Sequence, residues 1–265
     1  MKIWSHDSTW NLVLPPSRPN DFQLSIIKNK IKSLPYDANV AVLGSTPEFR
    51  DLLFETNISN IYVFDKSIEF YKKMSSQRIY DNAEIFVSGN WLETLNGFNS
   101  YFDMVLSDLT AGNIEYEMRR EFYRLIIRLL KENGCFIDKH LTNENGLLTL
   151  NEIQFKYSNL PVNLATVNDF SCEAIFCSEL QAIPEVIDTT RIYRLLNKCF
   201  HKNKRLQKFV ELAHLITPRD CFWYYGKSNI DYVEDMELEY KSTLSNTVYQ
   251  NRAYVYIWRK KKSSS

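Results

Sequence analysis

The sequence predicts an α/β fold: a mostly parallel sheet flanked by helices, a helical insertion, and an antiparallel pair of strands that closes the sheet. Between residues 39 and 138, short apolar runs alternate with helical segments, a pattern typical of parallel sheets covered on both faces. Near the end of the chain, residues 236–241 and 253–258 alternate with period two. These two runs lie close in sequence, so we expect them to pair antiparallel at one edge of the sheet.

The individual elements follow from local signals. Residues 20–34 place apolar side chains at helical spacing. The strands expected in the parallel sheet are apolar runs at 39–43, 61–64, 84–88, 102–108 and 135–138. The helices expected between them cover 47 to about 56, 67–75 and 115–132, and Asn133-Gly134 is a stop signal for the last one.

Residues 144–226 interrupt this alternation and are mostly helical, with amphipathic segments near 145–158, 188–200 and 203–216. We therefore divide the chain into four regions by sequence. They are an N-terminal loop and helix (1–35), a ligand-binding core (36–143), a helical region (144–230) and the closing strands of the core (231–262).

The composition limits the class of protein. With 265 residues, 45% of them hydrophobic, the chain can bury a core without disulfides or a structural metal, and we predict no metal site. Thirty-two basic residues balance 32 acidic ones, which makes nucleic acid an unlikely partner of the whole molecule. Five cysteines without a CxxC pair indicate reduced thiols. No apolar run suits a signal peptide or a membrane span, so we expect a cytoplasmic protein without a membrane partner.

The turn after the first predicted strand is a candidate ligand site. The strand ends at Gly44, and Ser45-x-x-Glu48 predicts a capping box for a helix with Pro47 in its first turn. A helix N-terminus at the carboxyl edge of a parallel sheet favours an anionic group. We therefore assign Gly44, Ser45 and Thr46 to a binding site.

The next strand ends extend this site to a nucleoside. Asp65 follows Gly44 by 21 residues, close to the spacing at which an acidic residue binds ribose hydroxyls. A carboxylate suits this task because it accepts two charge-assisted hydrogen bonds from a diol. The other residues assigned to the same edge are Lys66 beside Asp65, Gly89, Asn90 and Trp91 after the third strand, and Ser107 and Asp108 at the end of the fourth.

Together these strand ends resemble the class I S-adenosylmethionine-dependent methyltransferases, over residues 36–140 and the closing pair 236–258. The run Val-Leu-Gly-Ser-Thr-Pro-Glu at 42–48 is similar to a bacterial subgroup whose first motif reads Leu-Gly-x-Thr-Pro-Glu. Trp4, Trp10, Arg18-Pro19 and the turn at 224–228 are similar to that subgroup as well.

The resemblance implies a Rossmann-like sheet of seven strands with the last one antiparallel, S-adenosyl-L-methionine as cofactor, and methyl transfer to an N, O, S or C nucleophile. Two positions depart from the family pattern. Ala41 stands where the family usually has an acidic residue, so the methionine ammonium has no obvious partner, and Asn90 stands where Asp is common.

We therefore expect a methyltransferase that acts on a small-molecule acceptor bound by the helical region, with Asp108 and His140 as candidate general bases. Three alternatives stay open. A nicotinamide-dependent oxidoreductase would also use Asp65, although the chain lacks Gly-x-Gly-x-x-Gly. A nucleic-acid or protein methyltransferase would use the basic segment 191–208, and a non-catalytic nucleoside-binding protein would explain the missing acid. The sequence leaves the acceptor and the oligomeric state open.

Overall fold

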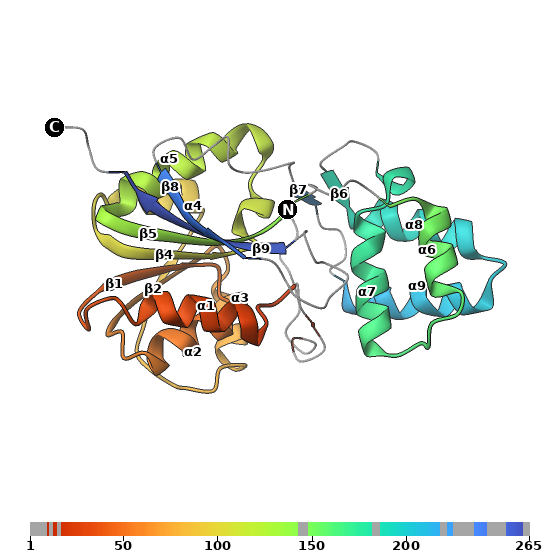
Figure 1. The fold of residues 1–265 in the computed structure, drawn as a ribbon, viewed down its shortest axis with the longest axis horizontal. Helices are drawn as coiled ribbons and strands as arrows, with labels where there is room; N and C mark the ends of the chain where they lie inside the picture. Colours follow the sequence, from red (N-terminus) through yellow and green to blue (C-terminus); the bar gives the residue numbers. More distant parts are fainter. Residues whose placement is uncertain are drawn as a thin grey trace.

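The computed structural model describes residues 10, 13–14, 17–142, 148–181, 186–217, 222–224, 236–242 and 253–261. Figure 1 shows two parts: a twisted sheet with helices on both faces, and a group of helices beyond the carboxyl edge of its parallel strands. None of the helices in these ranges is both long enough and apolar enough to cross a membrane.

The sheet has seven strands in the order β3-β2-β1-β4-β5-β9-β8. Their bounds are β1 Asn39–Leu43, β2 Asn60–Asp65, β3 Ile85–Ser88, β4 Phe102–Asp108, β5 Leu130–Leu141, β8 Met236–Lys241 and β9 Ala253–Lys260. The first five strands are parallel, and β9 runs antiparallel to both β5 and β8. This confirms the predicted fold. The strand order reverses between β1 and β4, and ligands of open α/β sheets bind at the carboxyl ends of the strands at such a point.

Helices cover both faces of the sheet (Figure 1). One face carries α1 (Asp21–Ile31), α2 (Pro47–Glu55) and α3 (Ile68–Ser75), and the other carries α4 (Trp91–Thr94) and α5 (Arg119–Leu129). Alternate residues of β1 enter the two cores: Val40 and Val42 pack with α1 and α2, whereas Ala41 and Leu43 pack with α5. Burial on both faces explains why this strand is a continuous apolar run.

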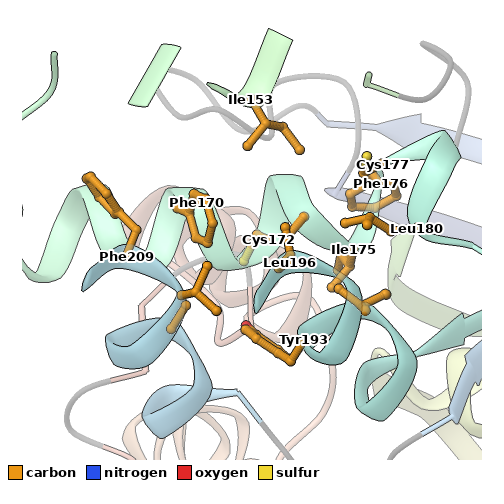
Figure 2. Close-up of a cluster of buried hydrophobic side chains, with 14 of the residues drawn as sticks. Ile153, Phe170, Cys172, Ile175, Phe176, Cys177, Leu180, Tyr193, Leu196 and Phe209 are labelled. Carbon is orange, nitrogen blue, oxygen red and sulfur yellow. The ribbon is translucent and has the colours of Figure 1, made fainter. Parts of the chain in front are cut away.

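The helical part has a core of its own. Four helices, α6 (Leu150–Tyr157), α7 (Leu164–Ile175), α8 (Thr189–Phe200) and α9 (Lys204–Ile216), enclose it. Figure 2 shows Phe170, Leu196 and Phe209 within this cluster. A two-stranded ribbon of β6 (Val186–Asp188) and β7 (Phe222–Tyr224) joins the two parts, because β7 lies against the 3-10 turn Thr110–Asn113 that follows β4.

The predicted junction between the helix at 115–132 and the strand at 135–138 is wrong. Helix α5 ends at Leu129, and β5 begins at once with Leu130, well before the stop signal Asn133-Gly134. Leu130 pairs with Phe102 and Cys135 with Met104, so an irregularity with Asn133 at φ 63° lies inside the strand. The glycine signal was misread because a chain bend within a strand needs the same residue types as a helix stop.

Candidate functional site

The turn after β1 is built around Gly44, whose φ of 92° is strained for any residue with a Cβ. Its N–H donates to the carbonyl of Phe64 at 2.8 Å, which ties the turn to the end of β2. The predicted capping box is wrong: Thr46 immediately precedes α2, and no side chain caps that helix. The hydroxyls of Ser45 and Thr46 instead donate to two carboxylates on neighbouring strands. Hydrogen bonds to charged acceptors are the stronger choice for a buried hydroxyl.

The first of these carboxylates belongs to Asp65 at the end of β2. Ser45 Oγ donates to its Oδ2 at 2.6 Å, and the backbone N–H of Ser67 donates to its Oδ1 at 3.0 Å. Asp65 is only 8% exposed, and burial raises its pKa although these donors oppose the rise. The carboxylate therefore faces the Gly44 turn, as a ribose-binding acid requires. The neighbouring Lys66 is exposed.

The second carboxylate belongs to Asp108 at the end of β4. Thr46 Oγ1 donates to Oδ2 at 3.0 Å, and Lys139 Nζ lies 2.7 Å from Oδ1. The side chain of Asp108 is 3% exposed and that of Lys139 is 0% exposed, so the two residues form a buried ion pair between β4 and β5. Sequence reasoning missed Lys139, and the available signal was a lysine that follows an apolar run near the end of a strand. Both oxygens of Asp108 are engaged.

Glu48, in the first turn of α2, is a further site residue that the sequence analysis treated only as a cap. Its Oε1 accepts from Trp10 Nε1 at 3.2 Å and pairs with Arg18, which brings the N-terminal Trp and Arg-Pro motifs onto the first motif. Its Oε2 is buried without a hydrogen-bond partner in the described part of the chain. Burial raises the pKa of Glu48, and the charge of Asp108 adds to that rise.

The residues that follow β3 lie at the same edge of the sheet. The N–H of Gly89 donates to the Asp65 carbonyl at 3.0 Å, and a Cβ at Gly89 would clash with Thr94. Asn90 is exposed, and its Oδ1 accepts from the N–H of Leu92 to cap α4. Trp91 Nε1 donates to the carbonyl of Phe64 at 2.9 Å. Of the three predicted residues, Gly89 contacts Asp65, whereas the indole N–H of Trp91 and the amide oxygen of Asn90 already support local structure.

The α5 side of β5 carries a second polar group of residues. Asp138 pairs in register with Ser107, is 1% exposed, and accepts from Tyr123 Oη at 3.3 Å. Burial raises its pKa to about 6. Ser107 is close enough to lower that pKa but does not reach hydrogen-bond geometry. Sequence reasoning missed Asp138, which directly follows the apolar run 135–137 within the strand.

His140 lies two residues further along β5 and is 1% exposed. Neither ring nitrogen has a hydrogen-bond partner among the residues that the structure describes. Burial, assisted by the charge of Arg119, holds the pKa of His140 well below its ordinary value. The imidazole is therefore neutral near pH 7, with one nitrogen able to accept a proton.

The structure thus brings most predicted residues to one edge: Gly44, Ser45, Thr46, Asp65, Gly89, Asn90, Trp91, Ser107 and Asp108 lie at the carboxyl ends of β1 to β4. His140 lies one strand further, near the end of β5. The motif residues Trp4 and 225–228 are outside the described residues. Within the described ranges, no group of three or more His, Cys, Asp or Glu residues is placed to hold a metal ion.

Comparisons with known proteins establish the fold. No protein-family model and no curated protein matches the sequence. An S-adenosylmethionine-dependent methyltransferase from Methanosarcina mazei superposes with a TM-score of 0.53 at 13% identity, covering 93% of this chain and 100% of that one. The 1,6-didemethyltoxoflavin-N1-methyltransferase of Burkholderia thailandensis, solved with its substrate and S-adenosylhomocysteine, gives 0.55 at 8% identity, covering 97% and 84%.

A Rhodobacter sphaeroides protein provisionally named a Zn-dependent alcohol dehydrogenase gives a TM-score of 0.60 at 14% identity, covering 96% of this chain and 95% of that one. At these identities the likeness concerns the fold alone. The chain has the Rossmann-like fold of the methyltransferases, with the antiparallel strand β9 between β5 and β8.

Proposed function

We propose that the protein is an S-adenosylmethionine-dependent methyltransferase that acts on a small-molecule acceptor. The observation that carries this proposal is Asp65, a buried carboxylate held against the Gly44 turn by Ser45 at the point where the strand order reverses. Two oxygens of a carboxylate provide about four acceptor sites, so the hydrogen bonds from Ser45 and Ser67 leave capacity for a ribose diol.

The described residues also suit the amino-acid end of the cofactor. Ala41 is fully buried within β1 and offers no charge. Glu48 and Asp108 lie close enough for the charge of Asp108 to raise the pKa of Glu48, and Glu48 Oε2 is without a partner. Arg18 already pairs with the other oxygen of Glu48 and Lys139 with Asp108, so Oε2 of Glu48 is the acceptor left open for a further cation. We therefore assign the methionine ammonium to Glu48, close to Asp108, in place of the first-motif acid.

Methyl transfer from a sulfonium requires few catalytic groups from the protein. S-adenosylmethionine supplies a methyl group on a sulfonium, so the acceptor lone pair bonds to the methyl carbon while the carbon–sulfur electron pair stays with sulfur. The side chains must align the acceptor, exclude water and receive any proton that it loses. His140 suits the last task better than Asp108, because both oxygens of Asp108 are engaged by Lys139 and Thr46.

The proposal is tested by calorimetry with S-adenosylhomocysteine and with 5′-methylthioadenosine, which lacks the amino-acid end. Replacing Asp65→Ala removes hydrogen bonds to a charged group, so both ligands should bind about 10- to 150-fold more weakly, or roughly 1.5–3 kcal/mol. Glu48→Gln should weaken S-adenosylhomocysteine alone. The matched control is Asp37→Ala, an exposed acid just before β1 at the opposite edge of the sheet. Unchanged affinity in Asp65→Ala would remove this residue from the site.

Two alternatives are tested alongside. Tighter binding of NAD than of S-adenosylhomocysteine would favour an oxidoreductase. A nucleic-acid methyltransferase is favoured by α8 and α9, where exposed Arg194, Lys198 and Lys204 belong to a stretch with seven basic residues between 191 and 208 and no acid. RNA binding that weakens steeply with salt would support that alternative.

A further inference from the structure

We propose that Asp138, His140 and Thr142, here called the acceptor cluster, bind the methyl acceptor and select an uncharged planar molecule that presents two hydrogen-bond donors. This inference rests on the proposed function and names the substrate class of the same site. The three residues occupy alternate positions along the end of β5 and just past it. They are at most 1% exposed.

The first argument is the set of buried polar atoms that have no partner. Both ring nitrogens of His140, Oδ1 of Asp138 and Oγ1 of Thr142 are buried without a hydrogen bond from any described residue. In folded proteins such atoms are nearly always bonded, and each exception needs an explanation. Four such atoms on three alternate residues, at the end of β5 and just past it, indicate a site that a ligand completes.

The helical part shows that this chain can satisfy buried hydroxyls. Tyr193 Oη lies 3.0 Å from Ser171 Oγ and 2.6 Å from Thr217 Oγ1, so all three hydroxyls bond to one another within the core of α7 to α9. Figure 2 shows Tyr193 in that cluster. Tyr157 Oη in the same core is also buried without a partner, so single exceptions occur there as well. The acceptor cluster differs because four such atoms lie on three alternate residues.

The second argument is position. Strand β5 is the neighbour of β4, and Ser107 and Asp108 pair in register with Asp138 and Lys139. Asp108 is the last residue of β4, so His140 lies one position past the end of that pairing. The acceptor cluster is thus one strand away from Asp108 and three strands away from Asp65, on the side of the sheet that faces α5.

The third argument is the chemistry of the groups. Above pH 6 the ionised Asp138 accepts hydrogen bonds, and the nearby charge of Arg119 balances its negative charge, so the cluster as a whole suits an uncharged molecule. The neutral imidazole of His140 accepts one hydrogen bond at one ring nitrogen and donates one from the other. The Asp138 carboxylate and the unprotonated nitrogen of His140 therefore each require an N–H or O–H group on the methyl-acceptor molecule. Alternate residues of a strand lie about 7 Å apart, which sets the scale of their separation.

The fourth argument is the aromatic surroundings. Tyr254 pairs in register with His140 and Tyr256 with Asp138, and both tyrosines belong to the core shared with α5. Tyr256 stacks on Trp258 with ring centroids 5.9 Å apart. Lys241 Nζ lies over the Tyr254 ring, 4.0 Å from its centroid, and 5.5 Å from that of Tyr256. A flat ring that carries the two donors would pack against the parts of these rings that the lysine does not cover, because aromatic rings pack well against one another.

The test uses protein loaded with S-adenosylhomocysteine and two probes with paired donors, resorcinol and lumazine. Their matched controls are 1,3-dimethoxybenzene and 1,3-dimethyllumazine, in which methyl groups block both donors, and the anionic control is 3,5-dihydroxybenzoate. Dissociation constants come from ligand-observed NMR. We expect at least one donor probe to bind about tenfold more tightly than its blocked control and than the anion.

Variants identify the site. Asp138→Asn and His140→Phe should each weaken the donor probe about tenfold while S-adenosylhomocysteine affinity and the cooperative melting transition are retained. Ser171→Ala, which alters a buried hydroxyl of the helical core, should leave probe binding unchanged. The assignment is overturned if neither donor probe binds, if blocked or anionic compounds bind equally well, or if both variants bind like the original protein. Failure to load S-adenosylhomocysteine would instead count against the proposed function.

Discussion

The two sides of the sheet's carboxyl edge differ in how their buried polar groups are satisfied. On the proposed cofactor side, Asp65 and Asp108 each receive hydrogen bonds on both oxygens, and Lys139 balances the charge of Asp108. On the acceptor side, Asp138 and His140 are equally buried but keep polar atoms without partners.

This difference suggests two ways of building a binding site. On the cofactor side, hydrogen bonds fix the orientation of the carboxylates before the cofactor binds. An acceptor supplies its own hydrogen-bonding groups, so the protein leaves the matching atoms open and loses stability there, at roughly 1–3 kcal/mol for each unsatisfied group. The stability measurements below test whether the two sides differ in this way.

The largest effect is expected at Lys139. Replacing Lys139→Met leaves the Asp108 carboxylate buried and uncompensated, which should lower the free energy of unfolding by about 3–5 kcal/mol. Urea unfolding measures this change. The matched control is the double variant Lys139→Met with Asp108→Leu, which removes both charges and should recover most of the loss. A single variant as stable as the original protein would show that the ion pair contributes nothing to the cofactor side.

On the acceptor side, removing the charge of Asp138 should raise the free energy of unfolding at neutral pH, whereas removing the charge of Lys139 lowers it. Its pKa of about 6 lies above the ordinary value near 3.8, so the folded state binds this proton more tightly than the unfolded state does. The contribution of Asp138 to stability is therefore present below pH 4 and is lost as the pH rises to 6, at a cost of about 3 kcal/mol above that pH.

Asp138→Asn does not titrate and should escape this loss. Its free energy of unfolding relative to the original protein should rise between pH 4 and pH 7.5 by an amount approaching about 3 kcal/mol. Urea unfolding at several pH values gives the difference. A difference that stays constant over this range would mean that Asp138 is not buried in its charged form.

Much of the sheet could be predicted from the sequence because its strands are marked locally. Residues 102–108 and 236–241 are strands with the predicted bounds, and Gly44, Asp65 and Asp108 lie at the predicted edge. Apolar runs and their end residues carry this information without reference to the rest of the chain.

What the sequence did not predict depends on contacts between distant residues. Ser45 has the right spacing to Glu48 for a capping box, but Asp65, 20 positions away, is the stronger acceptor for its hydroxyl. Lys139 and Asp138 lie on opposite sides of one strand, and only the packing of β4 and α5 separates their roles. The signal available in the sequence for Asp138 and Lys139 was the presence of two charged residues inside a strand near the binding edge.

The smallest expected effect is the change in stability when valine replaces each of two buried threonines, one on the cofactor side of the edge and one on the acceptor side. Thr46 donates to the Asp108 carboxylate, whereas the hydroxyl of Thr142 is fully buried without a described partner. Valine has nearly the same shape as threonine and lacks the hydroxyl. Thr46→Val should therefore lower the free energy of unfolding by about 1.5 kcal/mol, while Thr142→Val should leave it unchanged or raise it slightly. Equal losses in the two variants would show that Thr142 has a hydrogen-bond partner of its own, and the contrast between a completed cofactor side and an open acceptor side would then fail at this residue.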